Sequence, residues 1–292
     1  MIYFYEHKSG QFKSEYEIML AGYQGVYEYA SKHDMSPSAL YGTLEQLEKD
    51  IQLLNGAQFD FSSGENLALF NEWVDQYINY FNSNARYEKQ AYVLIGNIAS
   101  GKNTFAQTME EPTGSIIVDA DRFKMGEETR HGFFKGFTSL YHKPTDREQM
   151  QDMCAEAGKQ TMRNVADLGM NLILPKAPTS LEKLEKQIKY LREKNYDVHL
   201  ILFDTPVSEC VNRSYLRYLV KEYGYERNSD GSMVHGRFVP KSVVMSIGDG
   251  PFTTFAKAMK TPGSFASYRA FHNDKNKANE EIDLSTMILP EK

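Results

Sequence analysis

A glycine-bounded loop is the feature that most constrains the fold of this 292-residue chain. The loop reads GNIASGK, follows the apolar run AYVLI at residues 91–95 and precedes a helical segment. In the pattern G-x-x-x-x-G-K the chain turns sharply, so that successive backbone N–H groups point inward and can hold phosphate oxygens. The dipole of the next helix favours the same anions. The sequence therefore predicts a phosphate-binding loop (P-loop) made of Gly96, Asn97, Ala99, Ser100, Gly101, Lys102, Asn103 and Thr104.

The residue after the loop lysine departs from the usual pattern. A Ser or Thr hydroxyl normally binds Mg²⁺ there, whereas this chain has Asn103, with Thr104 one place later. The amide oxygen of Asn103 can bind the ion or one of its waters, because Mg²⁺ takes oxygen donors and keeps several waters. Thr104 replaces it if the first helical turn is altered, and weak metal binding with loss of activity is the third interpretation. An ordinary turn with a surface lysine competes with the P-loop as a whole.

Two carboxylates follow the next predicted strand, at residues 115–119. Asp119 and Asp121 come at its carboxyl end, and ligands of open parallel sheets bind outside that end. A kinase needs a carboxylate there to accept the proton of the attacking hydroxyl. Alternation places both side chains on one side if the strand continues that far. We expect Asp121 to be the base and Asp119 to lie near the metal; the alternative is that one or both only cap the next helix.

The chain changes character near residue 88. After it, apolar strand segments alternate with helical segments, which is typical of βαβ units and a mostly parallel sheet flanked by helices. Before it, three segments have helical spacing, near residues 13–30, 36–56 and 62–81, the last with Ser62 and Glu65 as a candidate capping box. The predicted fold class is α/β, with an all-helical N-terminal region at 1–88 and a P-loop domain at 89–292.

Composition excludes several classes of protein. The chain carries 33 Lys and Arg against 39 Asp and Glu, a net charge of −6, which argues against nucleic-acid binding through a basic surface. No apolar run approaches the roughly 20 residues that span a bilayer, and no classical signal peptide is visible. The two cysteines form no disulfide framework or metal motif. We expect a cytoplasmic protein, with export by a non-classical route left open.

Together, GNIASGK and the later DADRFK at residues 119–124 resemble the zeta toxin family of P-loop kinases. The resemblance covers about residues 90 to 260. It implies an ATP- and Mg²⁺-dependent kinase of a toxin–antitoxin system that phosphorylates a hydroxyl of UDP-N-acetylglucosamine. It also implies that Lys102 binds phosphate and Asp121 is the general base. Family arginines correspond to Arg213 or Arg217, and to Arg237, and such guanidinium groups suit a transferring phosphoryl group because they stay charged.

The acceptor side departs from the family. Where members tend to have Glu after the third strand, this chain has Lys176, and where an acid is expected on the preceding helix it has Lys159, with Glu156 a turn earlier. The acceptor is therefore open: a sugar nucleotide, NAD, a nucleoside or a polynucleotide end. The competing hypothesis is a regulatory protein, not an enzyme, whose degenerate P-loop binds nucleotide only as a ligand.

The helices before residue 89 have two interpretations. In zeta toxin systems a separate helical antitoxin silences the kinase at its nucleotide side. The resemblance suggests that residues 1–88 act within the same chain as an inhibitor or cap. The alternative is a structural extension that packs against the outer helices of the sheet.

Overall fold

A six-stranded sheet forms the centre of the computed structural model, which describes residues 3–6, 11–53, 64–81, 84–129, 132–137, 151–224, 227, 229, 231, 237–261, 263–273 and 279–287. The strand order is β10-β9-β8-β3-β7-β4, and all pairs are parallel except β10 with β9. The bounds are β3 Gln90–Gly96, β4 Ile116–Ile117, β7 Leu172–Lys176, β8 Asp197–Asp204, β9 Ser267–His272 and β10 Glu280–Glu281. This confirms the predicted mostly parallel α/β sheet.

Helices cover both faces of this sheet. They are α4 Lys102–Thr113, α5 Ala120–Met125, α7 Gln151–Asp167, α8 Leu181–Glu193, α9 Val207–Tyr223, α10 Lys241–Ile247 and α11 Gly250–Met259. Val93 and Ile95 pack in a cluster with α7, α8 and α11, while Leu94 packs in another with Ala106 of α4. Because successive side chains of a strand point to opposite faces, the apolar run of β3 is buried on both sides.

The N-terminal region contains three helices, as predicted, at Glu15–Lys32 (α1), Pro37–Leu53 (α2) and Gly64–Phe81 (α3). Ser14 and Glu17 form a reciprocal capping box at the start of α1. Ser62, which the sequence suggested as a cap, lies outside the described residues. The sequence analysis did not predict the antiparallel hairpin of β1 (Tyr3–Glu6) and β2 (Gln11–Ser14) that precedes α1.

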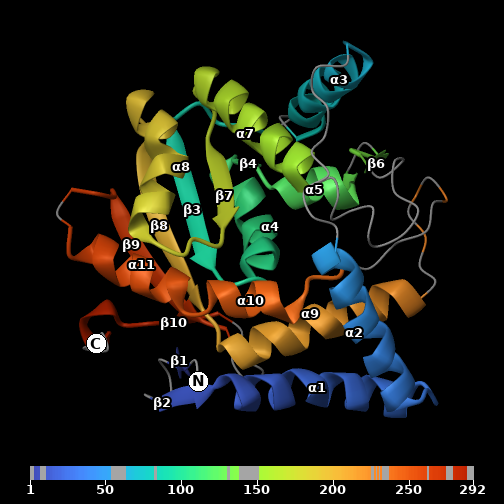
Figure 1. Cartoon of the computed structure of the whole chain (residues 1–292). Helices are drawn as coiled ribbons and strands as arrows, with labels where there is room; N and C mark the ends of the chain where they lie inside the picture. The colour runs from blue at the N-terminus through green and yellow to red at the C-terminus, as the bar shows by residue number, and fades with distance from the viewer. Residues whose placement is uncertain are drawn as a thin grey trace.

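The hydrophobic core runs across the boundary at residue 88. Helix α1 packs along α9, and α3 lies beside α7 (Figure 1). Tyr29 of α1 donates a hydrogen bond to the carbonyl of Leu219, at 3.3 Å. Tyr77 of α3 is fully buried and donates to the carbonyl of Ile117 in β4. Residue 88 therefore separates two patterns of elements, while the buried side chains on its two sides share their clusters.

One predicted element differs in extent from the observed one. The strand expected over 115–119 is only Ile116–Ile117, since the chain leaves the sheet and enters α5 at Ala120. The sequence also predicts a helix over about 146–168; it is described as Gln151–Asp167, and residues 146–150 lie outside the described part of the chain. A short hairpin of β5 (Glu127–Thr129) and β6 (Gly132–Phe134) follows α5.

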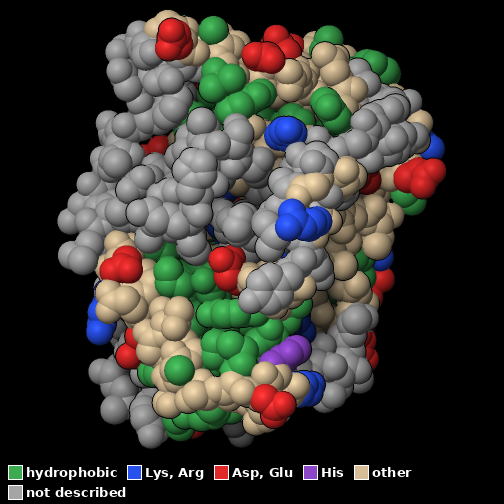
Figure 2. All heavy atoms as spheres, turned by 90° about the vertical axis from the view of Figure 1, so that its right-hand side faces the viewer, with side chains coloured by type: hydrophobic (Ala, Val, Ile, Leu, Met, Phe, Trp, Pro, Cys, Tyr) green, Lys and Arg blue, Asp and Glu red, His purple; other side chains and the backbone are tan. Residues whose placement is uncertain are grey.

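The described residues show neither a membrane-spanning helix nor, on the face drawn in Figure 2, a continuous basic stripe. None of the described helices combines the length and the apolar character needed to cross a bilayer. On the face that carries α2 and α3, the coloured side chains include acidic and basic groups scattered among hydrophobic and polar ones (Figure 2). This face therefore offers no continuous basic surface among its described residues for a nucleic-acid backbone.

Candidate active site

A cavity of about 610 Å³ lies at the carboxyl ends of β3 and β7. This is the edge at which parallel sheets bind their ligands. The lining comes from residues 98–104, 119–121 and 175–177, and from Gln151, Arg213, Arg217, Arg237, Asn273 and Asn279. The structure thus brings together the P-loop, both predicted carboxylates and the three arginines that the sequence singled out.

The P-loop is fixed to its surroundings by the buried side chain of Asn97. Its amide nitrogen donates to the carbonyls of Val244 (3.0 Å) and Gly248 (2.9 Å), at the end of α10. Its amide oxygen accepts the N–H of Ile98 at 2.7 Å. Asn97 therefore lies beneath the loop and holds its backbone, although it does not line the cavity.

Two glycines permit the tight loop. A Cβ at Gly96 would lie 2.8 Å from the carbonyl oxygen of Phe203 in β8, so that only glycine allows this approach. Gly101 has a φ of 92°, in the left-handed region that glycine adopts without strain. Both positions explain why the G-x-x-x-x-G spacing produces this conformation.

Two further side chains hold the carbonyl of Ser100. Asn273, directly after β9, donates to it at 2.7 Å, and the Thr205 hydroxyl donates at 3.2 Å. Sequence reasoning missed both contacts. A strand prediction over residues 267–272 would have placed Asn273 at the binding edge, since carboxyl ends of parallel strands meet there.

The ammonium group of Lys102 lies inside the loop. It donates to the carbonyls of Gly96 (2.9 Å) and Asn97 (2.6 Å) and to the Ser100 hydroxyl (3.3 Å). Burial lowers the pKa of Lys102 to about 8. The loop thus holds a buried positive charge at its centre, which favours phosphate oxygens.

Asp119 and Asp121 are positioned at the cavity by the start of helix α5, whereas the sequence predicted that a strand would position them. The strand ends before them, so alternation along a strand is the wrong reason for their proximity. Asp119 is the N-cap of α5: its Oδ1 accepts the N–H of Asp121 at 3.0 Å, and its Oδ2 accepts the side-chain amide of Asn103. Burial raises the pKa of Asp119, and the neighbouring charge of Asp121 adds to this. Asp121, in the first turn of α5, forms an ion pair with Arg237.

The oxygen donors of the site suit Mg²⁺, the ion that the resemblance implies. The carboxylate of Asp119, the amide oxygen of Asn103 and the hydroxyl of Thr104 belong to one cavity, and Mg²⁺ prefers such hard donors. Asn103 donates its nitrogen to Asp119, which leaves its oxygen for the ion. Among the described residues no three His, Cys, Asp or Glu side chains cluster as a metal cage. The residues therefore fit an ion held largely by phosphates and water.

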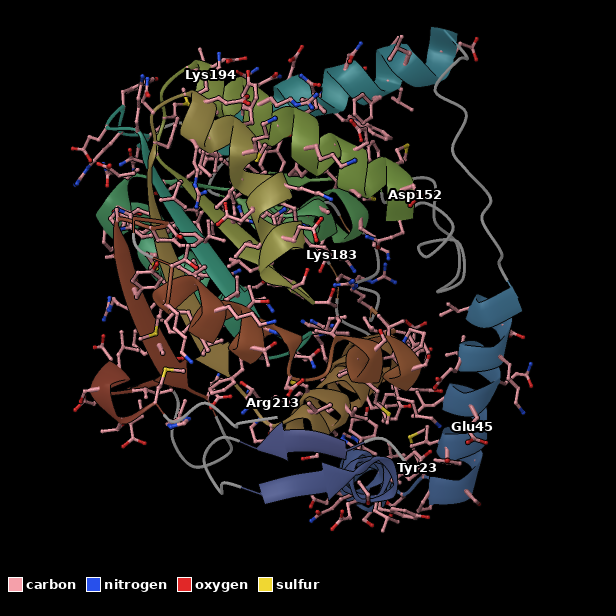
Figure 3. All side chains as sticks on the ribbon, turned by 60° about the vertical axis from the view of Figure 1, so that its left-hand side comes forward. Tyr23, Glu45, Asp152, Lys183, Lys194 and Arg213 are labelled. Atoms are coloured by element: carbon pink, nitrogen blue, oxygen red, sulfur yellow. The ribbon has the colours of Figure 1, made fainter. Side chains whose placement is uncertain are left out.

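The arginines differ in their present partners. Arg213 on α9 forms an ion pair with Glu209, at 2.8 Å; Figure 3 shows it on the helix that lies between α1 and the sheet. Arg237 pairs with Asp121. Arg217, one turn after Arg213, has no hydrogen bond or ion pair within the described parts of the chain, and burial, followed by the charge of Arg237, lowers its pKa to about 10. The choice between Arg213 and Arg217 is thus resolved in favour of both as lining residues.

Gln151 and Lys176 are lining residues that the sequence analysis did not propose for the site. Gln151, at the start of α7, accepts a hydrogen bond from the buried ammonium of Lys124, at 2.9 Å. Lys176, at the end of β7, was noticed only as a departure from the family pattern. Lys159 and Glu156 instead form an exposed ion pair on α7 and do not line the cavity within the described chain.

Solved structures with a similar fold include a chain of a toxin–antitoxin system and a complex with ATP. A chain of the PezAT chromosomal toxin–antitoxin system of the human pathogen Streptococcus pneumoniae gives a TM-score of 0.53 at 16% identity, over 74% of this chain and 81% of that one. The AvrRxo1-ORF1:-ORF2 complex with ATP gives a TM-score of 0.51 at 17% identity, over 79% of this chain and 68% of that one. At these identities the likeness shows a shared fold.

The family assignment rests on the sequence itself. No curated protein matches the chain. A model of the zeta toxin family matches residues 75–262, which is more than half of the chain and includes the P-loop, both carboxylates and the three arginines. Its first matched residue lies within α3, in agreement with the packing of that helix into the shared core. The chain belongs to the zeta toxin family.

Proposed function

We propose that this protein transfers the γ-phosphate of ATP to a hydroxyl of a sugar nucleotide or another nucleotide-like acceptor. The observation that carries the proposal is the convergence of Lys102, Asp121 and three arginines on one cavity at the carboxyl edge of the sheet. Phosphoryl transfer needs this combination of positive charge around the phosphates and one carboxylate near the acceptor. Membership of a family of kinases supports it.

The P-loop and the arginines bind and orient the triphosphate. The loop N–H groups and Lys102 hold the β- and γ-phosphate oxygens, and Mg²⁺, when bound near Asp119, Asn103 and Thr104, neutralises phosphate charge. Arg217 and Arg237 present forked donors to the group in transfer. Arg213 either leaves Glu209 to bind phosphate, or keeps that ion pair and adds positive charge beside Arg217.

Asp121 accepts the proton of the acceptor hydroxyl. Its carboxylate stands at the cavity wall and is oriented by Arg237, so one guanidinium can touch both the base and the phosphoryl group. Asp119 is committed to capping α5 and to Asn103, which makes it the less suitable base. The proposal therefore assigns general-base catalysis to Asp121.

The direct experiment is incubation with γ-labelled ATP and a metabolite extract, with mass identification of whatever gains phosphate. Pure UDP-N-acetylglucosamine, NAD, nucleosides and a 5′-hydroxyl oligonucleotide are tested in parallel. We expect one labelled product that disappears with Asp121→Asn. Tight ATP binding with no labelled product from any acceptor would refute the kinase assignment.

That last outcome would support a second candidate, a regulator that binds nucleotide only as a ligand. The specific observation in its favour is Asn103, whose amide is engaged with Asp119 in place of the usual metal-binding hydroxyl. Asn103→Ser discriminates between the two. Greater phosphoryl transfer in this variant supports an enzyme limited by its metal site, whereas continued inactivity supports the regulator.

We further propose that inhibition by the N-terminal helices, if it operates, works through α9. Residues 1–88 contribute no side chain to the described cavity lining, so they do not act as its lid there. Helix α1 instead packs along α9, which carries Arg213 and Arg217. A shift of α1 would therefore move the arginines. A separate antitoxin is the alternative partner, and co-purification from the native host with the full chain as bait tests for it.

A further inference from the structure

Lys176 occupies an unusual place for a lysine. It is the last residue of β7 and pairs in parallel register with Ile95, the residue immediately before the P-loop. Its half-buried side chain lines the same cavity as the loop. The strand register therefore places a second lysine at the cavity, on the strand next to the one that leads into the P-loop.

This ammonium group has no partner in the described protein. No hydrogen bond or ion pair joins Lys176 to any residue that the structure describes, in contrast to Lys102, Arg213 and Arg237. Its electrostatic neighbours are Asp119, which favours its charged form, and Lys159, which opposes it. Burial lowers the pKa of Lys176 overall. A charge held in this way is stabilised by an anion that enters the cavity.

The balance of charge within the cavity points the same way. Its described lining has five basic side chains, Lys102, Lys176, Arg213, Arg217 and Arg237, against the two carboxylates of Asp119 and Asp121. Arg213 and Arg237 already have acidic partners. Asp119 is the remaining carboxylate of the lining, and it faces Lys102, Lys176 and Arg217 together. Positive charge is therefore in excess, and it complements a polyanion such as a triphosphate.

We propose that Lys176 is a second phosphate-binding lysine, which contacts the β- or γ-phosphate of the bound nucleotide from the β7 side. The inference rests on the proposed ATP binding and assigns to this chain a contact of its own. A protonated lysine cannot ligate Mg²⁺, so Lys176 acts on the phosphate oxygens directly. ATP affinity therefore depends less on Mg²⁺ than it would if the ion alone neutralised the phosphate charge.

The test measures equilibrium binding of ATP, ADP and adenosine by calorimetry, in excess EDTA and again with Mg²⁺. The full chain is compared with Lys176→Met, which keeps the length of the side chain, and with Lys176→Arg, which keeps the charge. Lys183→Met is the matched control, because Lys183 is an exposed lysine near the start of α8 and its ammonium contacts Thr179 (Figure 3). Thermal melting without nucleotide checks that each variant is folded.

We expect Lys176→Met to weaken ATP binding in EDTA by about 10- to 100-fold, the effect of losing one hydrogen bond to a charged group. The loss should be smaller with Mg²⁺ and absent for adenosine. Lys176→Arg and Lys183→Met should bind ATP within a few-fold of the full chain. If Lys176→Met does not fold, Lys176→Gln takes its place in the same comparison.

Two results would overturn the proposal and one would strike at its foundation. Unchanged ATP affinity in the folded Lys176→Met protein removes the contact. If ATP affinity is unchanged but Lys176→Met weakens the binding of inorganic phosphate to the ATP-saturated protein, Lys176 contacts a phosphate of the acceptor instead. If the unsubstituted protein binds no ATP at all, the proposed function itself fails, and this is seen before any variant is compared.

Discussion

The two walls of the cavity are built by different means. On the P-loop wall, side chains donate hydrogen bonds to backbone carbonyls: Asn97 to the end of α10, and Asn273 and Thr205 to Ser100. On the opposite wall, side chains grip one another, as in the pairs Asp121 with Arg237 and Arg213 with Glu209. Backbone contacts fix a loop in advance of its ligand, whereas ion pairs between side chains can be exchanged when a charged ligand arrives.

This difference separates recognition from chemistry. The P-loop wall is preformed for phosphates, which all nucleotides share. The side-chain wall carries Asp121, the proposed base, and arginines that can exchange their acidic partners for phosphate. Substitutions on the P-loop wall should therefore alter stability and nucleotide affinity together, whereas those on the side-chain wall should alter turnover or nucleotide affinity with little effect on folding.

The largest effect that the comparison predicts is on turnover, at Asp121. Asp121→Asn should reduce phosphoryl transfer about 10²- to 10⁴-fold, because the general base is lost, with ATP affinity kept within a few-fold. Single-turnover transfer of labelled phosphate measures it. Asp119→Asn is the comparison: asparagine caps a helix about as well as aspartate, so α5 should keep its start, while transfer should need more Mg²⁺ because a carboxylate near the ion is lost. If Asp119→Asn abolished transfer at every Mg²⁺ concentration and Asp121→Asn did not, the wrong carboxylate would have been assigned.

Asn97→Ala tests the P-loop wall. It removes three hydrogen bonds, leaves the carbonyls of Val244 and Gly248 short of a donor and the N–H of Ile98 short of an acceptor, and should cost about 1–3 kcal/mol in the free energy of unfolding. ATP affinity should fall with it. Urea denaturation and calorimetry give the two quantities. Asn103→Ala, at an exposed side chain, should change stability by no more than about 0.5 kcal/mol. If Asn97→Ala and Asn103→Ala reduced the free energy of unfolding equally, the distinction between the two walls would be contradicted.

The pH dependence of ATP binding tests Lys102. Burial lowers its pKa to about 8, and bound phosphate should raise it again, so ATP affinity should be flat just below pH 8 and fall by up to about tenfold per pH unit above it. The terminal phosphate has completed its titration by then. Lys102→Arg should flatten the profile in any protein that still binds ATP. A slope that persists in that variant would assign the titration to another group.

The same lowered pKa acts on folding with the opposite sign. The unfolded chain, with Lys102 near 10.5, binds more protons than the folded chain between about pH 8 and 10.5. The contribution of Lys102 to the free energy of unfolding should therefore rise with pH across that window. Denaturation of the full chain and of Lys102→Met over the same range isolates it.

The smallest effect on the cavity should come from the α1–α9 contact. A Cβ at Gly25 would lie 1.9 Å from the Asn212 side-chain oxygen, so Gly25→Leu should destabilise the fold by about 1–3 kcal/mol while changing turnover only a few-fold. Gly42→Ala, in open space on α2, should instead stabilise by about 0.5–1 kcal/mol. Higher turnover in Gly25→Leu would show that α1 restrains the kinase.

The sequence predicts what is encoded locally. The apolar run of β3 and the loop after it follow from spacing and turn residues that lie within a few positions of each other. Helix α1 was likewise predicted from helical spacing near residues 13–30. These elements were confirmed because strand and helix periodicity depend only on neighbouring residues.

The contacts that complete the site depend on distant pairs. Asp121 and Arg237 are 116 residues apart, and Asn273 meets Ser100 across 173 residues. Spacing along the chain cannot supply such pairings, since they follow from the strand order and from the packing of α9 and α10. The proposed role of Lys176 could not be predicted for the same reason, because it depends on the register of Lys176 with Ile95 in the neighbouring strand.

The contact of α1 with α9 has a consequence in time. Tyr29 and Leu219 are 190 residues apart, and a ribosome adds about 5–20 residues per second, so α1 waits about 10–40 seconds for its partner. The helix that carries Arg213 and Arg217 therefore meets α1 only after these 190 further residues have been added. A nascent chain that already displays its P-loop still lacks these arginines, so the positive charge of the cavity is completed later than the loop.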